Sequence, residues 1–160
     1  AQVDDSETAS QEAEPAEVSS ESIRLRRPLQ LSLGFGFGAG KLGFPWVPLP
    51  SLRVGYQIIE QVNLYAEVEV MWLDNMLSVG AQWTILPHKT WSPYLLTNVV
   101  YGYIGPGAYH RMGASVGAGV NASLRKGFTF HFEVSTSLGR VLGENFYYQL
   151  RSRMGFGYRF

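Results

Sequence analysis

Residues 29–38 read Leu-Gln-Leu-Ser-Leu-Gly-Phe-Gly-Phe-Gly, which alternates large apolar residues with small or polar ones. Successive side chains of a β-strand point to opposite faces, so this stretch predicts a strand with one bulky apolar face. The other face carries glutamine, serine and glycine. A strand that crosses a membrane needs about 9–11 residues, and this segment has that length.

The same alternation recurs along the rest of the chain. Seven further segments carry it: 51–58, 63–73, 76–86, 93–104, 113–124, 128–138 and 148–160. In segment 93–104 the phase is ambiguous, because adjacent apolar residues occupy both faces. We favour the phase that turns Asn98 and Gly102 away from the apolar face. On the apolar face this phase places Leu95, Val99, Tyr101 and Tyr103.

Charged residues within these segments fall on the phase opposite to the bulky apolar residues. They are Arg53, Glu67, Glu69, Glu133, Arg151, Arg153 and Arg159. A water-soluble barrel turns its large apolar side chains inward, so this inverted pattern indicates an apolar face that meets lipid, where a base costs about 2–4 kcal/mol near the midplane. An open sheet edge would leave backbone groups unpaired in hydrocarbon. The sequence therefore predicts an all-β fold: a closed eight-stranded antiparallel up-and-down transmembrane β-barrel.

The 160-residue chain has a formal net charge of zero, but its two parts carry opposite charge. Residues 1–22, which we call the acidic segment, contain seven acids and no base, whereas residues 23–160 contain all 13 Lys and Arg residues. The acidic segment has too little apolar surface to offset the entropy of ordering. We predict a disordered periplasmic tail of residues 1–22 on a barrel of residues 23–160. The tail is either a solvated leader or a docking segment for a basic partner.

The chain ends on Phe160, and its last strand carries a recognisable pattern. Arg153, Gly155, Tyr158 and Phe160 resemble the C-terminal assembly signal of bacterial outer-membrane barrels. That signal combines a polar residue, a glycine and two alternating aromatics, and the resemblance implies recognition by the barrel assembly machinery. Region 29–160 is similar in plan to the small eight-stranded barrels of the OmpA and OmpX type. The resemblance implies the bacterial outer membrane, contact with its lipid and lipopolysaccharide, and periplasmic termini, but no particular function.

Periplasmic termini assign the connections between strands to the two sides of the membrane. We expect outer connections at 39–50, 74–75, 105–112 and 139–147, and periplasmic connections at 59–62, 87–92 and 125–127. The first outer connection holds a proline-stiffened apolar stretch that includes Phe44, Trp46 and Pro48 and that cannot be a central strand. It is a lid over the barrel mouth, a surface for a partner, or an insertion into the membrane interface.

An eight-stranded barrel is just wide enough for side chains to fill. Pairing about a turn near Glu60 sets Arg53 opposite Glu67, and a turn at 74–75 sets Glu67 beside Gln82. Glu133 falls near Arg151 or Arg153. We interpret the seven charged residues named above as a lumenal ion-pair network that blocks the bore, with a gated or selective ion path as the alternative.

Catalytic and metal sites find little support in this sequence. There is no cysteine, and the three histidines lack ligand spacing. A lipid A deacylase needs His-x-Ser where this chain has His131-Phe132-Glu133, and a rim set of His110, Asp74 and Ser115 is weak support for a lipid A palmitoyltransferase. We expect no enzymatic activity, no cofactor and no nucleic-acid partner.

The function predicted is that of a membrane anchor or structural subunit of an envelope assembly. In this interpretation the acidic segment contacts an envelope protein. The alternatives are a lipid A-modifying enzyme, or a small adhesin or narrow channel.

Overall fold

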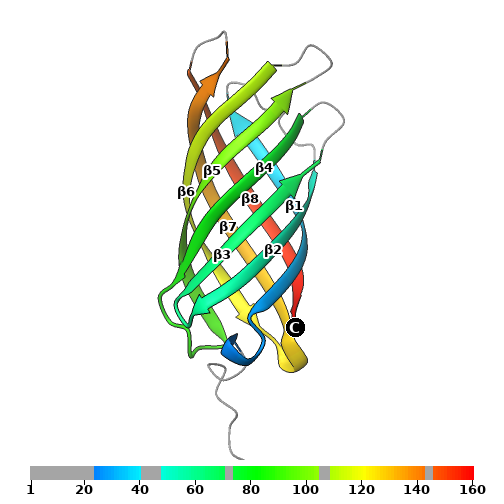
Figure 1. Cartoon of the computed structure of the whole chain (residues 1–160), viewed down its shortest axis with the longest axis vertical. Coiled ribbons are helices and arrows are strands. Elements are labelled where there is room, and N and C mark those ends of the chain that lie inside the picture. The colour runs from blue at the N-terminus through cyan, green and yellow to red at the C-terminus, as the bar shows by residue number, and fades with distance from the viewer. Residues whose placement is uncertain (1–23, 41–47, 71–73, 105–108, 143–145) are drawn as a thin grey trace, which may run out of the picture.

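A computed structural model describes residues 24–40, 48–70, 74–104, 109–142 and 146–160. The strands are β1 (Leu29–Gly40), β2 (Leu49–Ile59), β3 (Val62–Glu69), β4 (Asp74–Thr84), β5 (Trp91–Ile104), β6 (Tyr109–Ser123), β7 (Phe128–Val141) and β8 (Phe146–Arg159). Each strand pairs antiparallel with the next, and β8 pairs with β1 (Figure 1). The predicted closed eight-stranded up-and-down barrel is confirmed. The acidic segment lies outside the described residues.

The seam between β1 and β8 closes the sheet along its whole height. Pairing runs from Gln30 opposite Arg159 to Gly40 opposite Gln149. No helix in the described ranges is long and apolar enough to cross a membrane. We call the end of the barrel that carries Leu29 and Arg159 the terminal end, and the other the distal end.

Burial is inverted relative to a water-soluble protein. Outward-facing Leu33 and Phe156 are 67% and 66% exposed, whereas inward-facing Ser92 and Glu133 are 0% exposed. The phase favoured for segment 93–104 is also confirmed. The outward side chains of β5 alternate with buried Leu96, Asn98 and Val100. The barrel therefore has an apolar shell around a largely polar interior.

The predicted turn at 74–75 is wrong. Asp74 and Asn75 lie within β4 and pair with Ile104 and Tyr103 of β5. As a consequence Glu67 lies opposite Ser78, and Gln82 lies opposite Asn63 rather than Glu67. A slip by an even number of residues leaves every side chain on its own face, so the alternation alone cannot set this register. Met71 and Trp72, assigned by sequence to segment 63–73, lie outside the described residues.

Strands also extend further at the distal end than the pattern predicted. β2 begins at Leu49, so Pro50 lies within a strand and opposite Phe35. Its carbonyl accepts a hydrogen bond from Val70 N at 3.1 Å, and the missing N–H costs one bond near the end of the ladder. β6 begins at Tyr109 and β7 ends at Val141. The predicted connections 105–112 and 139–147 are therefore shorter than expected.

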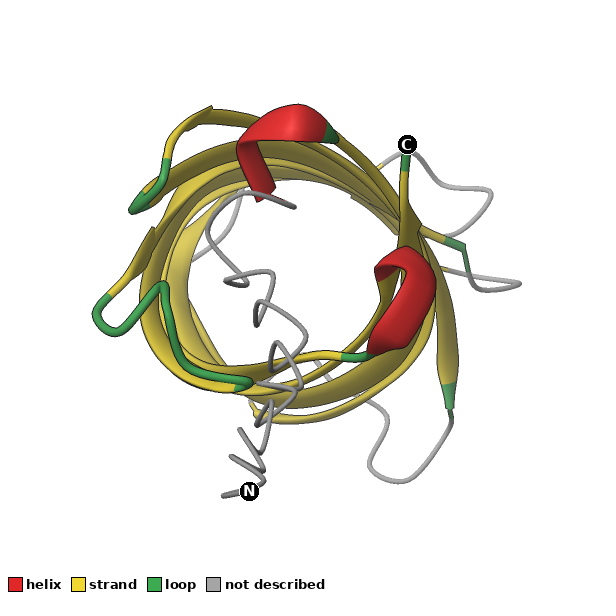
Figure 2. Cartoon of the chain, turned by 90° about the horizontal axis from the view of Figure 1, so that it is seen from below, coloured by secondary structure: helices red, strands yellow, loops and turns green. Residues whose placement is uncertain are grey.

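Short helical turns lie beside the mouth at the terminal end. Residues 24–26 form one turn, and Arg125–Gly127 form a 3-10 turn between β6 and β7 (Figure 2). Lys126 has φ 64° and Gly127 has φ 93°, which places both in the left-handed region. Glycine adopts that region freely, whereas lysine does so at a cost of about 1 kcal/mol. The terminal mouth thus carries structure beyond the strands.

Candidate functional site

The centre of the bore holds three bases and three acids. These six residues, which we call the lumenal cluster, are Arg53, Glu67, Glu69, Glu133, Arg151 and Arg153. None is more than 5% exposed. Glu67 and Glu69 are two apart on β3, as are Arg151 and Arg153 on β8, so each pair lies on the inner face of its strand. The cluster is formally neutral.

Arg53 joins two acids across the bore. Its Nη2 lies 2.9 Å from Glu67 Oε2 on the adjacent strand, and 2.9 and 3.0 Å from Glu133 Oε1 and Oε2 on β7. β1 and β8 separate β2 from β7 in the barrel, so this contact spans the lumen. Tyr94 of β5 donates to Glu133 Oε2 at 2.9 Å. The Arg53 guanidinium also lies over the Tyr65 ring, 4.5 Å from its centroid.

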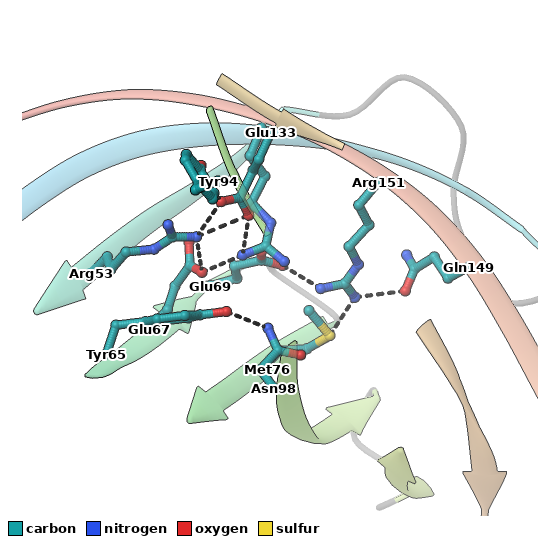
Figure 3. Close-up of polar contacts among 11 residues, drawn as sticks. Arg53, Tyr65, Glu67, Glu69, Met76, Tyr94, Asn98, Glu133, Gln149 and Arg151 are labelled. Atoms are coloured by element: carbon teal, nitrogen blue, oxygen red, sulfur yellow. Dashed lines mark hydrogen bonds and ion pairs between the residues drawn. The ribbon is translucent and has the colours of Figure 1, made fainter. Parts of the chain in front are cut away.

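The two arginines of β8 pair with the acids of β3 across the bore, and Figure 3 shows Arg151 directed towards Glu69. Arg153 pairs with Glu67, its Nε lies 3.1 Å from Glu69 Oε1, and its Nη1 lies 3.4 Å from Glu133 Oε1. Arg151 Nη1 donates to Glu69 Oε2 at 3.0 Å. Arg151 Nη2 also contacts Met76 Sδ on β4 and donates to Gln149 Oε1 at 2.6 Å.

Glycines on the inner face make room for these long side chains. A Cβ on Gly36 would lie 3.1 Å from Arg153 Cγ, and one on Gly119 would lie 2.6 Å from Tyr94 Cζ. A Cβ on Gly102 would lie 2.4 Å from Arg111 Nε. The high glycine content of the sequence therefore matches a bore in which several large side chains, among them Arg153, Tyr94 and Arg111, lie against a glycine.

Arg159, the seventh residue of the predicted network, lies apart from the lumenal cluster. It is at the terminal end, where its Nη1 donates to Gln57 Oε1 at 3.1 Å. Among the residues of the proposed assembly signal, Arg153 and Gly155 face the lumen, whereas Tyr158 and Phe160 face outward. The Tyr158 ring lies 5.2 Å from that of Phe128 and 5.0 Å from that of Phe160, between centroids.

The predicted lid falls mostly outside the described residues. Phe44 and Trp46 lie in the range 41–47, which the structure does not describe, and Pro48 is an exposed residue directly before β2. Sequence reasoning did not identify the uncharged members of the site. Tyr94 and Met76 both lie on the inner phase of their strands, and that phase was the available signal.

Of the rim set His110, Asp74 and Ser115, the structure places His110 and Ser115 on opposite faces of β6. His110 lies on the outer face of β6, with its Nδ1 2.6 Å from Tyr101 Oη, and its ring stacks on that of Tyr101. Ser115 is 1% exposed on the inner face of the same strand. His131 is buried in the bore beside Gly155. Arg111 and Arg140 fall within the predicted outer connections 105–112 and 139–147, but they lie in β6 and β7.

No protein-family model matches the chain, and no curated protein sequence is similar to it. Solved structures do match. Neisserial surface protein A (NspA) superposes with a TM-score of 0.61 at 15% identity, covering 82% of this chain and 96% of that one. The N-terminal β-barrel domain of Pseudomonas aeruginosa OprF superposes with a TM-score of 0.59 at 16% identity, covering 82% and 97%. The fold is that of the small eight-stranded outer-membrane β-barrels.

A de novo designed transmembrane β-barrel matches this outer-membrane barrel fold too, with a TM-score of 0.55 at 13% identity, covering 83% of this chain and 95% of that one. At such identities the likeness concerns the fold alone. Function has to be argued from the chain's own residues.

Proposed function

We propose that this chain is a non-enzymatic barrel of the bacterial outer membrane that serves as an anchor or structural subunit of an envelope assembly. Both termini are periplasmic in this proposal, the outer surface contacts lipid and lipopolysaccharide, and the barrel assembly machinery inserts the chain. The acidic segment contacts an envelope protein. The observation that carries the proposal is the lumenal cluster, which joins strands across the bore and so supports a barrel that does not transport solutes.

The chemistry of the cluster supports a closed bore. Ion conduction needs sites that bind an ion weakly enough to release it. Here Glu67, Glu69 and Glu133 are each held by two arginines at the distances given above. A passing ion would have to break pairs whose members are all buried, and that leaves charges uncompensated at a cost of several kcal/mol.

Planar-bilayer recording of the purified full chain tests the closed bore. We expect no stepwise conductance at any holding potential the bilayer tolerates. Reproducible unitary steps from a sample that migrates as a folded barrel on unheated gels would contradict it.

Co-purification from native membranes tests the anchor role. The full chain is compared with a variant in which the seven acids of the acidic segment are replaced by Asn or Gln. We expect a stoichiometric envelope protein with the first and its loss with the second. An identical set of partners for both chains would remove the acidic segment from the proposal.

Lipid A analysis tests the proposed lack of enzymatic activity. Mass spectra of lipid A from cells with and without the protein are expected to coincide. A mass difference equal to one acyl chain that appears with the protein would instead support a lipid-modifying enzyme.

A further inference from the structure

The positive charge of the barrel is concentrated at its terminal end. The lumenal cluster is neutral, and the described residues of the distal end combine Arg111 and Arg140 with Asp74. Among the described residues, the terminal end holds a single acid, Glu60. The six bases there whose side chains the structure describes, which we call the terminal basic face, are Arg24, Arg26, Arg27, Lys89, Lys126 and Arg159. Among the described residues, most of the excess of bases over acids therefore lies at one mouth.

Two of these bases point into the bore and have neutral partners. Arg24, 1% exposed, donates from Nη2 to Ser92 Oγ at 2.6 Å and to Ser123 Oγ at 3.4 Å. Arg159, 3% exposed, donates to the amide oxygen of Gln57. The charge of Arg24 also repels that of Arg159.

These two arginines differ from the cluster arginines in having no carboxylate partner among the described residues. Arg24 Nε, Arg24 Nη1 and Arg159 Nε are buried and find no acceptor in the part of the chain that the structure describes. Burying a cation without a counter-charge costs several kcal/mol. An anion bound at the terminal mouth would supply the counter-charge that Arg24 and Arg159 lack among the described residues.

The exposed bases continue this site around the rim. Arg26, Lys89 and Lys126 are exposed. Arg27 Nη1 donates to Lys126 O and to Tyr158 Oη, both at 3.2 Å, which holds its charge beside the Arg125–Gly127 turn. The buried pair and the rim together present cations over an area that suits several carboxylates rather than one small ion.

We propose that the terminal basic face binds an acidic peptide segment through its carboxylates, and that its occupant is residues 1–22 of the same chain. The acidic segment carries seven acids and no base, which matches the charge of the face. It joins the barrel directly before Arg24, so its effective concentration at the face is in the mM range. Lipid headgroups surround the outer wall, whereas Arg24 and Arg159 point into the bore, so lipid is the poorer occupant.

This inference does not rest on the proposed anchor role. It adds that an external basic partner has to displace the acidic segment from its own barrel before binding it. The face and the partner would then compete for the same carboxylates.

A labelled peptide tests the proposal. A fluorescein-tagged peptide of residues 1–22 is titrated by anisotropy into the full chain whose own seven acids are replaced by Asn or Gln. We expect salt-sensitive binding, since about 1 M salt shortens the Debye length to about 3 Å. The wild-type chain is expected to bind the peptide at least about tenfold more weakly, because its own segment occupies the face.

Variants locate the binding. Adding Arg24→Gln and Arg159→Gln to the neutral-segment chain is expected to weaken peptide binding at least about tenfold. Arg140→Gln, which changes an exposed base at the distal end, is the control and is expected to leave binding unchanged. Should the bore variants not fold, as judged by heat-shifted migration on gels, Lys89→Gln with Lys126→Gln tests the rim and is expected to weaken binding as well. No binding, or equal weakening by the distal control, overturns the proposal.

Two further measurements test whether a free anion or a lipid, rather than the peptide, occupies the terminal basic face. Phosphate and chloride at equal ionic strength are expected to displace the peptide equally, and stronger displacement by phosphate would assign the arginine pair to a free oxyanion. Nanodiscs with and without phosphatidylglycerol are expected to give similar affinities. Loss of peptide binding in the anionic nanodiscs would assign the face to lipid. Either result would overturn the assignment to residues 1–22.

Discussion

Single carboxylates of the lumenal cluster serve several donors at once. Glu133 accepts from Arg53 and Tyr94 and pairs with Arg153. Glu133→Gln keeps the shape of the side chain but leaves a buried arginine without its counter-charge. We expect it to lower the free energy of unfolding by about 3–5 kcal/mol, measured by urea titration in phospholipid vesicles.

Ser137 supplies the control for Glu133. It lies on the same strand, is 1% exposed and faces the lumen, and its Oγ has no hydrogen-bond partner in the described part of the chain. Ser137→Ala is expected to change the free energy of unfolding by less than about 0.5 kcal/mol. Equal unfolding curves for the two variants would show that the cluster does not stabilise the barrel.

Inner-face glycines are a second residue-scale determinant. A Cβ on Gly119 would lie 2.6 Å from Tyr94 Cζ and 2.4 Å from the Phe132 carbonyl oxygen, so backbone as well as side chain must move. Gly119→Ala is expected to destabilise by about 1–3 kcal/mol. In Gly36→Ala the new Cβ would lie 3.1 Å from Cγ of the flexible Arg153 side chain. This variant is therefore expected to lose less stability than Gly119→Ala. The same urea titration measures both, and a larger loss at Gly36 would contradict this account.

Strand β8 tests the assembly signal at the scale of an element. Phe160 and Phe156 are both outward-facing aromatics, 57% and 66% exposed, and each packs against one neighbouring ring at 5.0–5.1 Å between centroids. Phe160→Ala is expected to lower the fraction of chain inserted in the outer membrane of living cells while leaving refolding into vesicles unchanged. Phe156→Ala is expected to leave insertion intact, and equal insertion of both variants would remove Phe160 from the signal.

The strands also show which features of the fold the sequence pattern predicts and which it does not. Alternation predicts which face of each strand meets lipid, and Glu67 and Arg53 follow it to the inner face and to opposite positions. The β3–β4 register was wrong because an even slip preserves the faces, so the pattern is the same for both pairings. Contacts across the bore, such as Arg53 with Glu133, join strands that are not neighbours, and local spacing carries no signal for them. Arg159 was grouped with the cluster by phase, but its height along the barrel separates it.

At the scale of the whole molecule, charge is arranged in layers along the barrel axis. A neutral central layer of ion pairs crosses the bore, which we propose to be closed, and the terminal end is positive. Removing the central layer should therefore leave a path whose terminal mouth attracts anions. The variant that removes two bases and two acids, with no change in net charge, is Arg53→Ala, Glu67→Ala, Glu133→Ala and Arg153→Ala.

We expect this quadruple variant to give small unitary steps in planar bilayers, with reversal potentials in a salt gradient that favour anions, because a positive mouth raises the local anion concentration. The wild-type chain is silent in the same assay under the proposed closed bore. A control with four lumenal serines changed to alanine, at positions 78, 115, 135 and 137, keeps the cluster and is expected to stay silent. Silence of the quadruple variant, once heat-shifted migration shows that it is folded, would mean that side chains other than the cluster close the bore. Cation preference would contradict the charge layering.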